Sequence, residues 1–216
     1  MKEDTILQII LASQSPRRRQ LLELCGLSFS VRTAPCEEAS ISQKIRSQTA
    51  HLDAYRQADH LTKALSREKA LSVFRSFPSD VVIGADTVVV SGDRILEKPG
   101  DPKEAEEMLL SLCGITHRVY TGVTLLAPSY DHTFSSFATV EFFKDSPAMR
   151  HIICAYLRSG SPMDKAGAYG IQDFGSLMVK SIQGDFYTVV GLPVGLLYQK
   201  LLEIPQIHLQ TDLQRR

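Results

Sequence analysis

The 216-residue chain lacks several features that would assign it to a particular class of protein. Its four cysteines are scattered and form no C-x-x-C pair, a pattern that favours reduced thiols over a disulfide framework or a zinc site. No apolar run reaches the roughly 18 residues that a membrane span needs. The charged N-terminus leads directly into a predicted strand, unlike a signal peptide. We therefore expect a cytoplasmic protein that makes no use of a membrane.

Several familiar catalytic motifs are also missing. The chain has no Walker A lysine motif, no G-x-G-x-x-G and no G-x-S-x-G, and its six histidines do not cluster. These absences argue against a P-loop enzyme, a dinucleotide oxidoreductase and a serine hydrolase. The 24 basic and 24 acidic residues give a formal net charge of zero, so no global field attracts nucleic acid. We expect no stable nucleic-acid binding.

What is present is a regular alternation of strands and helices, which predicts an α/β protein on a mixed sheet. The predicted strands are 6–12, 29–33, 81–90, 94–97, 119–126 and 133–143, and the predicted helices are 16–24, 52–74, 102–112, 147–158 and 193–205. Residues 34–49 look polar and irregular, and 177–182 with 186–190 read as a hairpin. We expect one domain over 1–204, followed by a polar tail, 205–216.

The start of the first predicted helix carries a chemical signal. Ser15 is a good N-cap, and Pro16 suits the first helical position. Arg17 and Arg18 follow at once, where each cation opposes the helix dipole at a cost of about 0.3–1 kcal/mol. A bound anion offsets that cost, and phosphate is the commonest one. The segment therefore predicts a phosphate site, with a solvated basic helix start as the alternative.

A carboxylate lies inside the most apolar strand. Asp86 interrupts the run 81–90, where a carboxylate costs several kcal/mol unless it is paired, hydrogen-bonded or bound to metal. We predict a general base or a metal ligand, with a structural aspartate at a strand bend as the alternative. Gly84, two residues earlier, allows another backbone or a ligand to approach the strand closely.

Three further charged residues indicate a functional site only when they are considered together with the other motifs. Lys98 follows a turn that brings it back beside the Asp86 strand, and Lys69 lies inside a predicted helix. Glu38 stands in a loop next to another glutamate, and hard divalent cations select such carboxylate oxygens. Taken singly, each of the three is typical of a solvated surface.

The glycine-rich stretch 164–172 is suited to contact with a planar ligand. Its glycines bracket small residues and one tyrosine, and it ends on Gln172, whose amide offers two donors and an acceptor. Glycine lets the backbone approach a planar ligand, so the stretch suits a base read by hydrogen bonds. As an isolated motif it is weak, since glycine loops are common.

Together these segments resemble the Maf family of nucleoside triphosphate pyrophosphatases over roughly residues 6–202. The resemblance is carried by LASQSPRRRQLL, REKA, GADTVV, LEKP and SGSPMDKAGAYGIQ, in that order, followed by a Gly-Asp turn and VGLP. It implies an elongated mixed sheet flanked by helices, with two lobes around a nucleotide cleft. It also implies hydrolysis between the α- and β-phosphates, which releases pyrophosphate.

The resemblance implies a role for each matching residue. Asp86 is implied as the catalytic base, although it could instead hold an activating metal, and the sequence does not separate these roles. A divalent cation, Mg²⁺ or Mn²⁺, is implied beside Glu38 and Asp86. The implied substrate-binding residues are Ser13, Arg17, Arg18, Lys69, Thr87, Lys98 and Gln172, with Arg17, Thr87 and Gln172 governing base choice and Arg18, Lys69 and Lys98 holding phosphates.

The loop YGIQ is similar to the branch of the family that hydrolyses dTTP and UTP. Two alternatives stay open: a pyrophosphatase for a modified purine nucleotide such as 7-methyl-GTP, and a non-enzymatic regulator of cell division. Two departures from the family pattern matter. Asp173 follows Gln172 where the family commonly has glycine, and the segment 41–64 is longer than usual. The sequence leaves a homodimer open.

Overall fold

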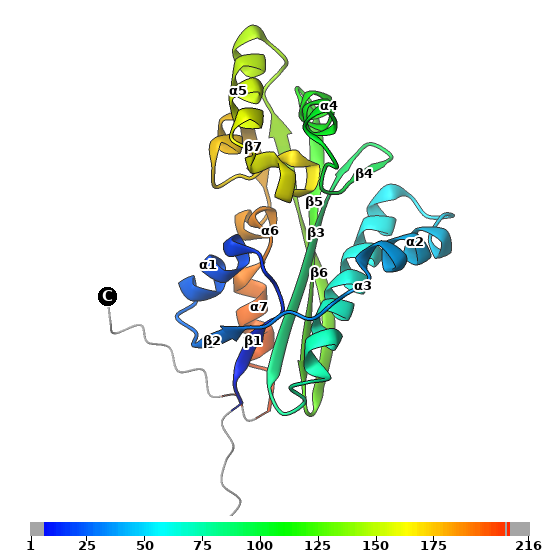
Figure 1. The fold of residues 1–216 in the computed structure, drawn as a ribbon, viewed down its shortest axis with the longest axis vertical. Helices are drawn as coiled ribbons and strands as arrows, with labels where there is room; N and C mark the ends of the chain where they lie inside the picture. Colours follow the sequence, from blue (N-terminus) through cyan, green and yellow to red (C-terminus); the bar gives the residue numbers. More distant parts are fainter. Residues whose placement is uncertain (1–6, 206, 208–216) are drawn as a thin grey trace, which may run out of the picture.

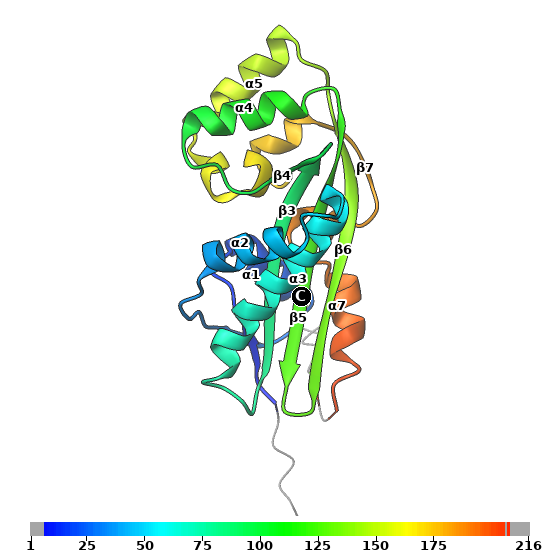
Figure 2. The same ribbon diagram turned by 90° about the vertical axis from the view of Figure 1, so that its right-hand side faces the viewer.

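The computed structural model describes residues 7–205 and 207. Seven strands form one mixed sheet in the order β2-β1-β3-β5-β6-β7, with β4 paired to β3, so the predicted α/β fold is confirmed (Figures 1 and 2). The strands are β1 (Ile9–Leu11), β2 (Phe29–Val31), β3 (Val81–Ser91), β4 (Arg94–Leu96), β5 (Thr116–Ala127), β6 (Tyr130–Phe142) and β7 (Val179–Gln183). The start of the predicted strand 6–12 and nearly all of the predicted tail lie outside the described residues.

Three of the longer helices begin at a capping residue followed by proline. Ser15, Asp101 and Ser146 each accept a hydrogen bond from a backbone N–H in the first turn, and each is followed by proline, as predicted. The α-helices are α1 (Pro16–Leu24), α2 (Glu38–Gln48), α3 (Ala54–Phe74), α4 (Pro102–Leu112), α5 (Pro147–Arg158), α6 (Phe186–Val190) and α7 (Val194–Leu201). Three short 3₁₀ turns follow α5: η1 (Ser161–Asp164), η2 (Ala166–Ala168) and η3 (Phe174–Met178). None of these described helices has the length and apolarity to cross a membrane.

Two local predictions are wrong. The segment expected to be irregular contains α2, whose Ile41 and Ile45 lie one turn apart and pack against the core, a pattern too sparse to stand out. The expected second hairpin strand is α6, because Asp185 caps it by accepting from the N–H groups of Tyr187 and Thr188. β-Branched composition favoured a strand there, but the cap decides the conformation.

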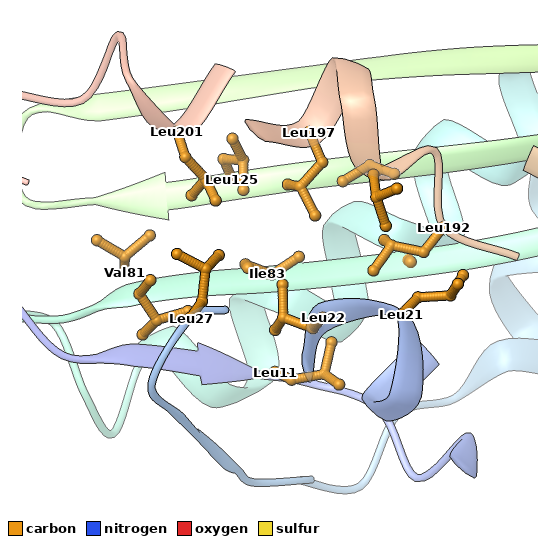
Figure 3. Close-up of a cluster of buried hydrophobic side chains, with 14 of the residues drawn as sticks. Leu11, Leu21, Leu22, Leu27, Val81, Ile83, Leu125, Leu192, Leu197 and Leu201 are labelled. Atoms are coloured by element: carbon orange, nitrogen blue, oxygen red, sulfur yellow. The ribbon is translucent and has the colours of Figure 1, made fainter. Parts of the chain in front are cut away.

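The long strands β3, β5 and β6 run the length of an elongated molecule, and helices gather around both of its ends (Figure 1). In the lower half α1 and α7 cover one face of the sheet and α3 covers the other (Figure 1). Leucines from α1 and α7 meet Ile83 and Leu125 in the core of that half (Figure 3). A second core lies at the upper end, where α4 and α5 pack against Phe142 and Met178. Both groups of helices thus rest on the same strands.

The neighbours of β3 leave a gap on one side. β1 pairs with it only as far as Ile83, and β4 pairs with it only from Val89 onward. Within the described chain, residues 84–88 therefore have a strand neighbour only on the other side, where β5 lies. Successive side chains of a strand point to opposite faces, so Asp86 and Thr87 present their groups on both faces at this gap.

Glycines let α3 lie directly on the sheet. A Cβ at Gly84 would collide with the carbonyl oxygen of Ser66 and would lie 2.8 Å from the backbone nitrogen of Ala70. A Cβ at Gly122 would collide with the backbone of Thr62. The close approach predicted at Gly84 is thus confirmed, and the partner is helix backbone. It brings the side chains of α3 within reach of those of β3.

We expect Gly122→Ala to destabilise the protein by about 1–3 kcal/mol, because the methyl group must push α3 off the sheet. The free energy of unfolding, measured with denaturant, tests this. Gly195→Ala, on α7, is the control: its added Cβ would meet no other part of the structure, so stability should stay the same or rise slightly, since alanine favours a helix. Equal stability of the two variants would contradict the close approach.

Candidate active site

A cleft of about 460 Å³ opens at the gap beside β3. The loop from β1 to α1, the middle of β3 and the segment after α5 all contribute to its walls. All the residues predicted to act in catalysis, substrate binding or metal binding line it: Ser13, Arg17, Arg18, Glu38, Lys69, Asp86, Thr87, Lys98 and Gln172. Their common location is a structural fact, whereas their individual roles stay predictions.

Arg18 is held by three hydrogen bonds to protein acceptors. Its guanidinium donates to the carbonyl oxygen of Gly191 at 2.9 Å, to Thr87 Oγ1 at 3.0 Å and to Ser13 Oγ at 3.3 Å. Burial lowers the pKa of Arg18 from its ordinary value, although nearby Asp86 opposes that shift. Three protein acceptors therefore fix the orientation of the guanidinium at the start of α1. The guanidinium is thus held by protein groups rather than solvated, and its role in binding phosphate stays a prediction.

Lys69 joins two carboxylates at the opposite wall. Its Nζ lies 2.6 Å from Asp86 Oδ1 and 3.0 Å from Glu38 Oε2. Burial alone would lower the pKa of Lys69, but the charges of Asp86 and Glu38 outweigh burial and raise it. The carboxylate that looked isolated in an apolar strand is therefore paired, through a lysine that α3 carries over β3.

The two carboxylates around Lys69 could hold a divalent cation together with the phosphates of a substrate. In the part of the chain that the structure describes, no three carboxylate, histidine or cysteine side chains form a metal cage. Glu38 and Asp86 nevertheless share one neighbour and supply hard oxygen donors from two elements. Mg²⁺ is commonly held by one or two carboxylates together with substrate phosphates. The residues present fit that arrangement.

A third cluster of charged side chains, Arg17, Asp164 and Lys165, lines the cleft where the start of α1 meets the segment after α5. Arg17 Nη1 lies 3.1 Å from Asp164 Oδ2, and Asp164 Oδ1 in turn lies 2.7 Å from Nζ of the buried Lys165. Neither Asp164 nor Lys165 was predicted to belong to the site. A lysine among glycines and small apolar residues was the available signal. Around the whole cleft, five cationic side chains face three carboxylates.

Tyr169 lines the cleft and is held from behind by His117. His117 Nε2 lies 2.9 Å from the tyrosine hydroxyl, and both rings pack edge-on against Phe142. His117 is 2% exposed, and its Nδ1 has no hydrogen-bond partner among the described residues. Burial lowers the pKa of His117 to about 4, so the ring stays neutral at physiological pH.

Acid should destabilise the fold through His117. Between about pH 6.5 and pH 4 the unfolded chain binds a proton that the folded chain rejects, so stability falls as the pH falls. We expect this group to cost roughly 2 kcal/mol between pH 7.5 and 4.5. Unfolding free energies at both pH values should show a smaller loss for His117→Gln than for the wild type. The control His151→Gln, at an exposed site on α5, should behave as wild type; a loss in His117→Gln that also matches the wild type contradicts the assignment.

The fold and the cleft together define a class: an α/β protein with a cleft, at a gap in a mixed sheet, arranged to receive an anion. The family model described as Maf-like protein matches residues 8–204, and the chain belongs to this family. The resemblance inferred from the sequence is thus confirmed.

Three proteins that are similar to this chain in sequence share one name. A protein of Shouchella clausii is 43% identical over 185 residues, which cover 86% of this chain and 89% of that protein. A protein of Bacillus cereus is 42% identical over 194 residues, covering 90% of this chain and 94% of that protein. A Bacillus anthracis protein matches to the same extent. All three are named dTTP/UTP pyrophosphatase.

Proposed function

We propose that this protein is a nucleoside triphosphate pyrophosphatase that hydrolyses UTP and dTTP to the nucleoside monophosphate and pyrophosphate. The observation that carries the proposal is the pairing of Asp86 with Lys69 inside a cleft that also contains the prepared guanidinium of Arg18. The names of the similar proteins support the same reaction. We further propose that the protein acts in the cytoplasm, in nucleotide-pool housecleaning.

The cationic side chains neutralise the triphosphate. A nucleoside triphosphate brings about four negative charges, and hydrolysis requires that they be balanced before water reaches phosphorus. Arg18 and Lys69 hold opposite walls of the cleft, and the exposed Lys98 lies at its border. Arg17 is available once it exchanges the carboxylate of Asp164 for a phosphate oxygen, a charge-assisted bond of the same kind.

Asp86 is placed to handle the attacking water. Lys69 binds Oδ1 and so restrains the rotation of the carboxylate. In the proposed reaction Asp86 orients the water and accepts its proton. Glu38 and Asp86 would hold a divalent cation, which when bound supplies charge neutralisation for the phosphates and activates water.

Asp86→Asn should lower turnover by roughly 10²–10⁴-fold with the fold intact, because general-base groups contribute about that much. Release of pyrophosphate from UTP measures the loss, and circular dichroism checks the fold. Asp145→Asn, which disrupts an exposed ion pair with Arg150 on α5, is the matched control and should keep wild-type turnover. Near-normal turnover of a folded Asp86→Asn variant removes Asp86 from the mechanism.

The amide of Gln172 is proposed to read the base. Uracil and thymine present an N3–H between two carbonyl groups, whereas cytosine presents a ring acceptor beside an amino donor. A fixed amide that suits the first pattern leaves a polar group unpaired against the second, which can discriminate by several orders of magnitude. Gln172 lines the cleft next to Ile171, so it is in position for this contact.

A nucleotide panel tests the substrate assignment. We expect UTP and dTTP to be hydrolysed well and CTP poorly, and Gln172→Ala to reduce that preference more than it reduces the rate. Gln183→Ala, at an exposed amide on β7, is the control and should keep the preference. Equal hydrolysis of CTP and UTP by the wild type contradicts the pyrimidine assignment, and faster hydrolysis of 7-methyl-GTP favours the purine alternative.

A further inference from the structure

Asp173, directly after Gln172, lies outside the cleft. Gln172 lines the cleft, but Asp173 is not among its described lining residues. The carboxylate of Asp173, which follows the glycine-rich stretch 164–172 in the sequence, therefore lies behind that stretch in the structure.

Its two oxygens are both engaged with protein groups. Oδ1 accepts the backbone N–H of Gly175 at 2.9 Å, which caps η3. Oδ2 accepts from Ser161 Oγ at 2.7 Å and from the hydroxyl of Tyr156 at 3.2 Å, and Lys165 Nζ lies 3.4 Å away. Burial alone would raise the pKa of Asp173, but these donors and the charge of Lys165 outweigh it and lower the pKa. The carboxylate is therefore held in its charged form.

Tyr156 carries the contact to the other side of the loop. Its hydroxyl, on a residue that is 1% exposed, accepts the backbone N–H of Gly170 at 3.0 Å. Gly170 immediately precedes Ile171 and Gln172, and Asp173 immediately follows them. One buried hydroxyl thus ties together the two residues that flank Ile171 and Gln172, which both line the cleft.

Close packing leaves that segment little freedom. A Cβ at Gly170 would lie 2.6 Å from Lys165 Cε and 3.1 Å from Asp173 Oδ2. A Cβ at Gly175 would collide with the carbonyl oxygen of Gly170. Lys165 itself donates to the carbonyl oxygen of Ser161 at 2.6 Å, so the cation that balances Asp173 is also fixed.

We propose that Asp173, acting through Tyr156 and Lys165, is a positioning residue that fixes the backbone around Gln172 and thereby sets the preference for UTP over CTP. The inference rests on the proposed function, because it deepens the account of the same site. Selectivity by a side-chain amide requires a fixed amide. A loop that can shift lets Gln172 adapt to either base, which erodes discrimination while phosphate contacts persist.

The test measures kcat/KM for UTP and for CTP in Asp173→Asn, Asp173→Gly and Tyr156→Phe. UTP and CTP carry the same triphosphate, so damage to the phosphate site or a smaller folded fraction lowers both values and leaves their ratio unchanged. We expect the UTP:CTP ratio to fall at least about fivefold in Asp173→Gly and Tyr156→Phe, and less in Asp173→Asn, which retains one acceptor oxygen. Thermal melts confirm that each variant is folded.

Two controls match these changes away from the cleft. Tyr130→Phe removes another tyrosine–carboxylate hydrogen bond, that to Glu203 Oε2 at 2.9 Å, and Asp145→Asn removes another carboxylate. Both should keep the wild-type ratio. An unchanged ratio in all three Asp173 and Tyr156 variants, with a selective wild type, overturns the inference alone. A wild type that hydrolyses UTP and CTP equally overturns the pyrimidine assignment and the inference with it. If Asp173→Gly and Tyr156→Phe fail to fold, Asp173→Asn decides by the same ratio.

Discussion

The bridge from Lys69 to Asp86 and Glu38 is the interaction on which the site depends. It places one cation between two carboxylates, and the charges of Asp86 and Glu38 raise the pKa of the largely buried Lys69 against the effect of burial. The bridge exists because α3 lies directly on β3 and β5, at glycines where any side chain would meet helix backbone. A packing constraint in the sheet is thus a condition for the chemistry of the site.

The gap beside β3 explains why the cleft is where it is. β1 ends too early and β4 begins too late to cover residues 84–88, so one strand presents groups to both walls. Asp86 meets Lys69 on the α3 side, while Thr87 meets Arg18 on the other side. The pair of Arg17 with Asp164 then connects the start of α1 to the segment after α5. Local strand pairing therefore organises a site built from residues far apart in the chain.

Much of the fold could be predicted because local signals agreed with each other. Serine or aspartate followed by proline marked three helix starts, and the apolar run 81–90 marked the central strand. The helix α2 and the short α6 were missed, since a sparse apolar pattern hid one and β-branched composition disguised the other. The boundary of the domain at residue 204 stays a prediction.

The candidate site shows the same division. Asp86 was identifiable because a carboxylate in an apolar strand needs a partner, but the identity of that partner depends on how α3 packs, which no local pattern encodes. Asp173 could be recognised as a departure from the family, yet its orientation depends on Tyr156 and Lys165 from other segments. The sequence therefore identified residues that line the cleft, and tertiary packing determines which groups hold them.

We propose that the cleft directs hydrolysis to the bond between the α- and β-phosphates. Product analysis of UTP turnover by ³¹P nuclear magnetic resonance tests this directly. We expect uridine monophosphate and pyrophosphate in equal amounts from the first turnover. Formation of uridine diphosphate and inorganic phosphate, or no turnover of any nucleoside triphosphate in the presence of Mg²⁺ or Mn²⁺, would contradict it.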